Sequence, residues 1–115
     1  VLDHAGKPPI ATAGMADWWR GLARVAERPN VLCKVSGLLT EARPGTPPTV
    51  IGELVRRIAD LWGPDRLIWG SDWPVLTLSG DYRDWLALTR GALHHLSGEE
   101  RAAVFGGNAK RVYGL

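Results

Sequence analysis

Three places in the sequence carry polar side chains directly after a short apolar run: Asp3-His4, Ser36 and Asp72. An imidazole and a carboxylate that lie together can bind a metal ion, or can polarise a carbonyl group and activate a water molecule to attack it. Polar residues at strand ends also often do no more than cap backbone groups, and for an isolated pair that is the commoner role. The catalytic interpretation requires the side chains of His4 and Asp72 to lie together, whereas the capping interpretation does not.

Short apolar runs alternate with amphipathic stretches along the chain, and these segments must position the polar residues. Strands are predicted at residues 1–4, 31–36 and 66–70, helices at 15–28, 49–62 and 81–96, and a Gly/Pro-rich loop at 38–48. Thr49 is expected to cap the second helix, and Asp81 to open the third. Ser97 and Glu100 have the spacing of a capping box for a short helix that ends at residues 106–107, and Asn108 is expected to cap one more turn.

This βα, βα, βα order is typical of a parallel sheet with crossover helices. The carboxyl ends of its strands lie at one edge, where loops build active sites, so His4, Ser36 and Asp72 are expected there together. Three such strands cannot bury both sheet edges. The chain is therefore either about three-eighths of a barrel or a small open sheet. A full barrel needs roughly 250 residues, and the start at Val1, in what reads as mid-strand, favours a fragment.

The composition is that of an ordinary globular protein, with 45% hydrophobic and 23% charged residues, and residues 1–115 are treated as one partial domain. The net charge is only +2 and the basic residues are scattered, so no nucleic-acid partner is expected. Cys33 is the only cysteine, which rules out an internal disulfide and a cysteine-based zinc site, and its apolar flanks predict a buried thiol. No membrane span or signal peptide is visible, so a cytoplasmic location is expected.

Four motifs follow one another along the chain: Asp3-His4-Ala5-Gly6-Lys7-Pro8, Lys34-Val35-Ser36-Gly37-Leu38, Trp69-Gly70-Ser71-Asp72-Trp73-Pro74 and, from Gly107 to Leu115, Gly-Asn-Ala-Lys-Arg-Val-Tyr-Gly-Leu. Each motif alone is a weak signal. Together, in this order and over essentially the whole chain, they closely resemble the C-terminal part of the amidohydrolase-related lactonases. That family includes L-fuconolactonase and 2-pyrone-4,6-dicarboxylate hydrolase.

The resemblance implies an α/β fold in which the chain forms the βα units of strands 6–8 of a (β/α)₈ TIM barrel. It places His4 at the family's strand-six histidine and Asp72 at the strand-eight aspartate, the general base that activates the attacking water. His4 and Asp72 would hold one divalent metal ion, zinc for example, in metal-bearing members. In metal-free members the histidine would help to polarise the carbonyl. The family's His-x-His pair of strand one has no counterpart here, so the chain holds only two of the four expected site residues.

Trp73 and Lys34 are candidate substrate contacts. Trp73 follows Asp72 directly and faces either the pocket or the core. Lys34 shares a strand face with Ser36 and points either into the barrel mouth or to solvent. Ser71 is expected to support the site by hydrogen bonding only. Away from it, His94 and His95 lie late in a helix and are interpreted as surface residues, while Asn108 and Arg111 match a terminal signature that looks structural.

Thr40 and Glu41 are further candidate substrate contacts, because both could hydrogen-bond sugar hydroxyls. Glu41 would also repel an anionic substrate. The dicarboxylate hydrolases carry an arginine soon after the Ser-Gly of strand seven, whereas this chain has none before Arg43. The resemblance therefore favours a neutral sugar (aldono)lactone as substrate.

The leading functional prediction is a hydrolase that opens a small lactone by Asp72-activated attack of water on the ring carbonyl. The alternative is a catalytically incomplete fragment or half-barrel that acts only with a partner, either the missing barrel half or further copies of itself. The isolated chain is expected to be inactive. A decarboxylase of the same superfamily is less favoured, because no basic cluster stands near the strand ends to hold a carboxylate.

Overall fold

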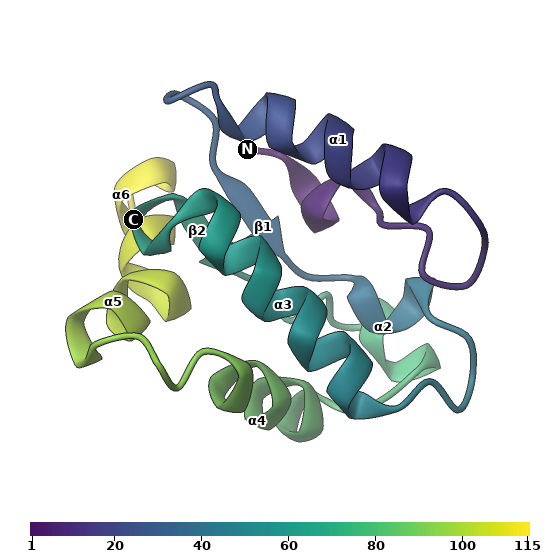
Figure 1. Ribbon diagram of the computed structural model, residues 1–115. Coiled ribbons are helices and arrows are strands. Elements are labelled where there is room, and N and C mark those ends of the chain that lie inside the picture. Colours follow the sequence, from purple (N-terminus) through teal and green to yellow (C-terminus); the bar gives the residue numbers. More distant parts are fainter.

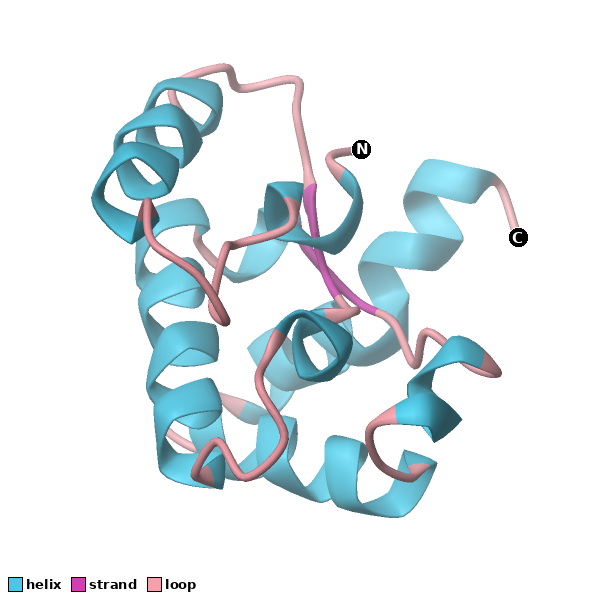
Figure 2. Ribbon diagram, turned by 90° about the vertical axis from the view of Figure 1, so that its right-hand side faces the viewer, coloured by secondary structure: helices cyan, strands magenta, loops and turns pink.

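Two short parallel strands, β1 (Cys33–Val35) and β2 (Leu67–Trp69), lie at the centre of the computed structural model, which describes residues 1–115. Helices surround them on several sides (Figures 1 and 2). The helices are α1 (Met15–Ala26), α2 (Leu38–Glu41), α3 (Pro48–Trp62), α4 (Tyr82–Ala92), α5 (Gly98–Ala102) and α6 (Asn108–Tyr113). Short 3₁₀ turns span Asp3–Gly6, Pro64–Arg66 and Val75–Leu78, and a π-type turn spans Ala103–Gly107.

The first predicted strand, at residues 1–4, is reduced to a single parallel bridge between Leu2 and Cys33. The Leu2 N–H donates to the Leu32 carbonyl at 2.8 Å, and the Lys34 N–H donates to the Leu2 carbonyl at 2.9 Å. His4 and Ala5 then adopt left-handed φ values of 50° and 49°, which turn the chain out of the extended conformation. The spatial order of Leu2, β1 and β2 is nevertheless the predicted one, and all three run in parallel.

Two helices differ from the sequence prediction: α3 starts at another residue, and α2 was not predicted. Helix α3 begins at Pro48 with no side-chain cap, so Thr49 lies inside its first turn and does not cap it. Proline fits the first helical position because its missing N–H would find no partner there. The loop predicted at 38–48 contains the single turn α2, whose Leu38 is fully buried, and one turn is too short for a periodic pattern to reveal.

The C-terminal third follows the predicted signals at the starts of α4 and α5 but not at the start of α6. Asp81 caps α4, its carboxylate accepting the Asp84 N–H at 2.8 Å, although α4 ends at residue 92 and not at 96. Ser97 and Glu100 form the predicted capping box of α5, with hydrogen bonds of 3.1 and 3.0 Å. The prediction for Asn108 is wrong, because its side-chain amide caps no helix. It donates to the carbonyls of Pro64 and Leu67 at 2.7 and 2.8 Å, next to the start of β2.

The two faces of the sheet have different surroundings. The register pairs Cys33 with Leu67, Lys34 with Ile68 and Val35 with Trp69. The side chains of Cys33, Val35 and Leu67 join a core of 17 buried residues with the helices, and Trp69 packs against it. Ile68 is buried as well, yet it lies outside that core, because alternate residues of a strand point to opposite faces. The second face therefore carries Lys34 and Ile68.

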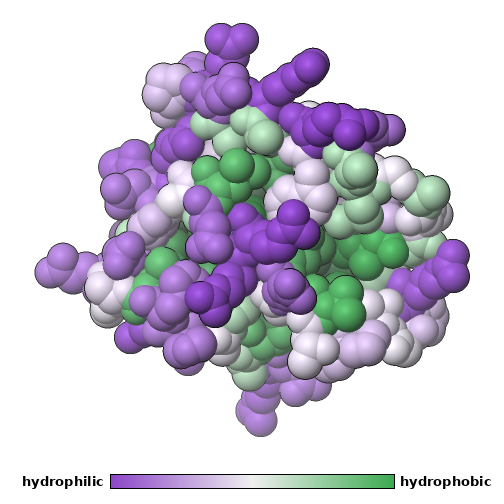
Figure 3. Space-filling model, viewed as in Figure 1, coloured by the Kyte–Doolittle hydropathy of each residue, from purple (hydrophilic) through white to green (hydrophobic).

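The surface mixes hydrophilic and apolar side chains, as Figure 3 shows for the face seen in Figure 1. The large apolar side chains that are exposed are Val1, Val50, Trp73, Val75, Leu78, Tyr82, Tyr113 and Leu115. None of the helices combines the length and the apolar character that crossing a membrane would require.

Candidate active site

The structure brings His4, Ser36 and Asp72 together at the carboxyl ends of the strands. His4 Nδ1 lies 2.7 Å from Ser36 Oγ, and His4 Nε2 lies 3.7 Å from Asp72 Oδ1. The side chains of His4 and Asp72 are largely buried, with 24% and 15% of their surface exposed. Neither the ring nor the carboxylate hydrogen-bonds a backbone group, so the capping role is not what places them here.

His4 and Asp72 both have left-handed backbone conformations. Outside glycine, positive φ values occur only at His4, Ala5, Lys7 and Asp72, where they range from 49° to 59°. Such conformations cost free energy in non-glycine residues and persist where the surrounding structure holds them. All four residues lie in the two turns that carry the candidate catalytic pair, so the surrounding structure must hold both turns in place.

Two glycines make room for this arrangement. A Cβ atom on Gly37 would lie 2.7 Å from His4 Nδ1, and the φ of 68° at this position is itself unfavourable for other residues. A Cβ atom on Gly70 would lie 3.1 Å from Ser36 Cβ and 3.3 Å from Lys34 Cδ. The close approach of Gly37 and the His4 ring therefore depends on the absence of a side chain.

Ser36 belongs to the site, although sequence reasoning placed it only at a strand end and gave it no role. Its side chain is 1% exposed, and its hydroxyl has His4 Nδ1 as its only hydrogen-bond partner. The bond fixes the imidazole ring so that Nε2 is directed toward Asp72. The available signal was its position at the end of the middle strand, between two strands that end in His4 and Asp72.

His4 and Asp72 fit two of the positions around a metal ion. Imidazole nitrogen and carboxylate oxygen are zinc ligands, and two tetrahedral ligands at ~2.1 Å from the ion lie roughly 3.4 Å apart, close to the 3.7 Å observed. Ser36 supplies the outer hydrogen bond that metal-binding histidines ordinarily make. No group of three or more His, Cys, Asp or Glu side chains in the chain is arranged to hold a metal ion. Further ligands would have to come from outside these residues.

Of the predicted substrate contacts, Lys34 is the one whose side chain forms an ion pair with a residue beside His4. Its Nζ is 3.3 Å from Asp3 Oδ1, and the other Asp3 oxygen is 3.4 Å from His4 Nε2. Asp3 therefore connects the lysine and the imidazole. The Lys34 side chain is 30% exposed, and it lies on the sheet face of Ser36, as its spacing predicted.

No hydrogen bond or ion pair joins the side chains of the other three predicted contacts to those of His4 or Asp72. Trp73 is 67% exposed, so it lies outside the core that residues 1–115 form. The Thr40 hydroxyl donates to the Gly37 carbonyl at 2.9 Å, and Glu41 ends the same short helix, α2. Ser71 accepts the N–H of Trp73 at 3.3 Å, a contact that supports the turn around the aspartate.

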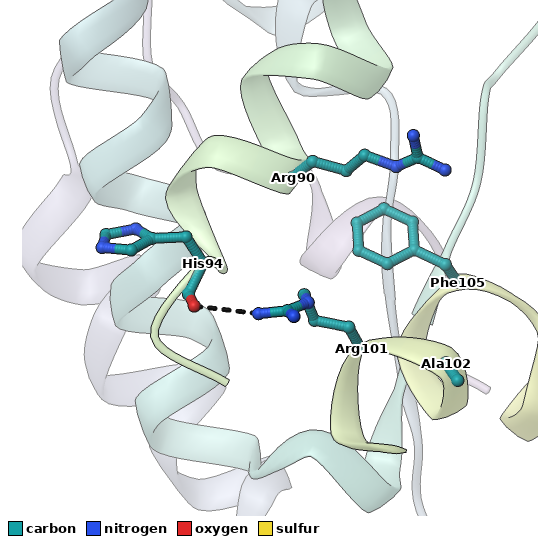
Figure 4. Close-up of a pocket in the computed structure, with 5 residues that line it drawn as sticks. All are labelled: Arg90, His94, Arg101, Ala102 and Phe105. Atoms are coloured by element: carbon teal, nitrogen blue, oxygen red, sulfur yellow. Dashed lines mark hydrogen bonds between the residues drawn. The ribbon is translucent and has the colours of Figure 1, made fainter. Parts of the chain in front are cut away.

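A hollow of about 350 Å³ lies elsewhere, between the end of α4 and the α5 region. Figure 4 shows that its polar groups do not converge, because the His94 ring and the Arg90 guanidinium point away from each other. Arg101 donates to the carbonyls of His94 and Leu96 at 2.9 and 2.7 Å, so it connects α5 to the turn that follows α4. His94 and His95 are exposed, as predicted, and this hollow has no catalytic arrangement.

Cys33 lies on the core face of β1, fully buried, as its apolar flanks predicted. Burial raises the pKa of the Cys33 thiol to about 12, because the thiolate loses its hydration there. The thiol is therefore protonated and unreactive at neutral pH, and it takes no part in the site.

The whole chain, residues 1–115, matches the family model described as Amidohydrolase. It is similar to two proteins named L-fucono-1,5-lactonase. The protein from Burkholderia ambifaria is 46% identical over 98% of this chain, and the one from Burkholderia multivorans is 41% identical over all of it. A crystal structure of a zinc-bound amidohydrolase from Burkholderia multivorans matches 99% of this chain, with a TM-score of 0.92 and 40% identity. This chain spans only 40% and 43% of the lengths of the two lactonases and 43% of the crystallised chain.

Proposed function

Because this chain belongs to the amidohydrolase family, we propose that the complete protein is a lactonase that opens a neutral sugar lactone by hydrolysis. The observation that carries the proposal is the meeting of His4 and Asp72, 3.7 Å apart, at the carboxyl ends of parallel strands. Active sites of (β/α)₈ barrels occupy this edge. The two relatives named L-fucono-1,5-lactonase make L-fucono-1,5-lactone the first substrate to test.

Asp72 is the general base of the proposed reaction. Its carboxylate takes a proton from a water molecule whose oxygen attacks the lactone carbonyl carbon, and the ring C–O bond breaks as its oxygen leaves and gains a proton. In the metal-free form of the reaction, His4 acts at the carbonyl oxygen, where a positioned N–H stabilises the developing negative charge. Ser36 on Nδ1 and the glycine at position 37 hold the ring in the required orientation.

A divalent metal ion would be held by His4 and Asp72, and when bound it would supply Lewis-acid polarisation of the carbonyl. The zinc-bound relative supports this assignment. The chain offers two ligands, so the remaining ones must come from other parts of the complete protein or from a partner chain. This incompleteness favours the prediction that the 115-residue chain by itself is inactive.

A panel of lactones tests the proposal. The complete protein is assayed with L-fucono-1,5-lactone, other aldonolactones and an anionic pyrone dicarboxylate, each with and without a chelator. We expect hydrolysis of the neutral sugar lactones, little turnover of the dicarboxylate because Glu41 repels it, and no activity in the 115-residue chain alone. Loss of activity with chelator and its return with zinc would identify the metal-dependent form. Turnover confined to the dicarboxylate would contradict the substrate assignment.

A further inference from the structure

Both turns that carry the proposed catalytic pair receive a hydrogen bond from a tryptophan. In the first turn, the indole N–H of Trp18, on α1, donates to the Ala5 carbonyl at 3.0 Å. Ala5 follows His4 directly, shares its left-handed conformation and is fully buried. The bond therefore restrains the peptide group that joins Ala5 to Gly6, one residue beyond His4.

The second turn has the same arrangement. The indole N–H of Trp85, on α4, donates to the Gly70 carbonyl at 2.9 Å, two residues before Asp72. Trp85 is 1% exposed, and the Gly70 N–H donates to the Val35 carbonyl at 3.1 Å. The N–H and the carbonyl of Gly70 are thus both hydrogen-bonded, two residues before the left-handed conformation of Asp72.

Other buried indoles of the chain make no such bond. The indole N–H groups of Trp62 and Trp69 are buried and have no hydrogen-bond partner. Tryptophan N–H groups usually find a partner when buried. The chain thus leaves two of them unpaired, while two others are aimed at backbone carbonyls beside His4 and Asp72. The four non-glycine residues with positive φ all lie in these two turns.

We infer that Trp18 and Trp85 are positioning residues, which hold the strained turns and thereby fix His4 and Asp72 for lactone hydrolysis. The inference rests on the proposed function for its catalytic consequence. The physical effect lies in the backbone, because each indole restrains a peptide group within two residues of the reacting side chain. Small misplacements of reacting groups lower turnover strongly.

The test compares Trp85→Phe and Trp18→Phe with Trp62→Phe in the complete protein. Each substitution keeps an aromatic ring at its position and removes one indole N–H. Only the first two remove a hydrogen bond, so Trp62→Phe controls for the change in ring size. We expect kcat on the best lactone to fall ~10-fold or more in Trp85→Phe and Trp18→Phe, with KM changed far less. In Trp62→Phe we expect kcat to stay within about twofold of wild type.

Amide hydrogen exchange supplies a readout that does not depend on activity. The Leu76 N–H donates to the Asp72 carbonyl and the Lys7 N–H donates to the His4 carbonyl, both at 2.8 Å, so each amide reports on one turn. We expect faster exchange at Leu76 in Trp85→Phe and at Lys7 in Trp18→Phe, and wild-type exchange at both in Trp62→Phe. If a phenylalanine variant does not fold, benzothienylalanine at the same position removes the N–H and keeps the ring size.

Unchanged exchange and unchanged kcat in both variants would overturn the inference, as would equal losses in Trp62→Phe. A wild-type protein that opens no lactone would overturn the proposed function instead. In that case, faster amide exchange at Leu76 in Trp85→Phe and at Lys7 in Trp18→Phe would still show that the two indole hydrogen bonds hold the turns.

Discussion

At the scale of single residues, Asp72 is the side chain on which the proposed chemistry depends most directly. Asp72→Asn keeps the size of the side chain and removes its charge, so the protein should fold while kcat falls by about 10²–10⁴-fold, the usual contribution of a general base. Ser71→Ala should lower kcat much less, because the one hydrogen bond of the Ser71 hydroxyl is to the N–H of Trp73. Steady-state kinetics on the best lactone measure kcat for both variants. Equal losses of kcat would show that Ser71 acts directly in the reaction.

Gly37→Ala tests the packing of the imidazole. The new Cβ atom would lie 2.7 Å from His4 Nδ1, so the ring must move, and we expect kcat to fall by about 10²-fold. Gly45→Ala is the matched control, because Gly45 also has a positive φ, 83°, but a Cβ atom there would have no neighbouring atom within 4 Å. The left-handed backbone alone should lower the stability of each variant by about 1–2 kcal/mol. Loss of activity in both variants would show that backbone strain, and not displacement of His4, is responsible.

The positions of His4 and Asp72 could be predicted from the sequence, because both follow apolar runs and the ends of parallel strands share an edge. The contact between Ser36 and the imidazole could not. It depends on the left-handed turn at His4, which brings the ring over Gly37, and no side-chain pattern marks a non-glycine residue for that conformation.

At the scale of the elements, the start of α5 makes a prediction about pH. Glu100 accepts the Ser97 N–H and lies in the first helical turn. The hydrogen bonds from Ser97 lower the pKa of Glu100 below its usual value. A group with a lowered folded-state pKa stabilises the fold above its unfolded pKa, and this stability is lost as the pH falls through the folded value. Glu100→Gln should therefore be less stable than wild type at pH 7, and the difference should shrink in acid.

Urea unfolding between neutral pH and about pH 3 measures this difference. Glu99→Gln is the control, because Glu99 carries the same charge in the same turn but makes no hydrogen bond to Ser97. A difference between wild type and Glu100→Gln that stays constant across this range would show that the carboxylate does not contribute through its charge.

The long helices could be predicted because their apolar spacing repeats over several turns, as it does in α3 with its buried Ile51, Leu54, Val55 and Ile58. The capping box could be predicted because Ser97 and Glu100 have the spacing that defines it. The first strand could not be predicted correctly. Val1 and Leu2 look like the start of an apolar strand, but the left-handed turn that follows ends the pairing after one bridge. The side chain of Asn108 also found tertiary partners 41 and 44 residues away, which no local pattern can show.

At the scale of the whole molecule, the chain forms part of an α/β barrel and exposes more surface than a closed domain would. Its accessible surface is 6693 Å², whereas a monomer of this mass is expected to expose about 6,200 Å². The two-stranded sheet also leaves an edge of β2 without a strand partner. Unpaired edges favour pairing with other chains.

We therefore expect the 115-residue chain, produced alone, to associate with itself in the micromolar range. Sedimentation at several concentrations would show a weight-average mass rising above 12.5 kDa. The complete protein should show no such association through this edge. A 115-residue chain that stays at 12.5 kDa at every concentration would contradict the prediction.

The single bridge between Leu2 and Cys33 has a consequence for the order of assembly. Asp72 follows a strand that is paired along three residues, whereas the segment that carries His4 joins the sheet through one bridge. During folding, we expect the Asp72 half of the site to form together with the core and the His4 segment to dock last. The newly folded chain would thus pass through a stage with its core complete and its imidazole still in solvent. Docking of residues 1–7 would then be the final step in maturation of the site.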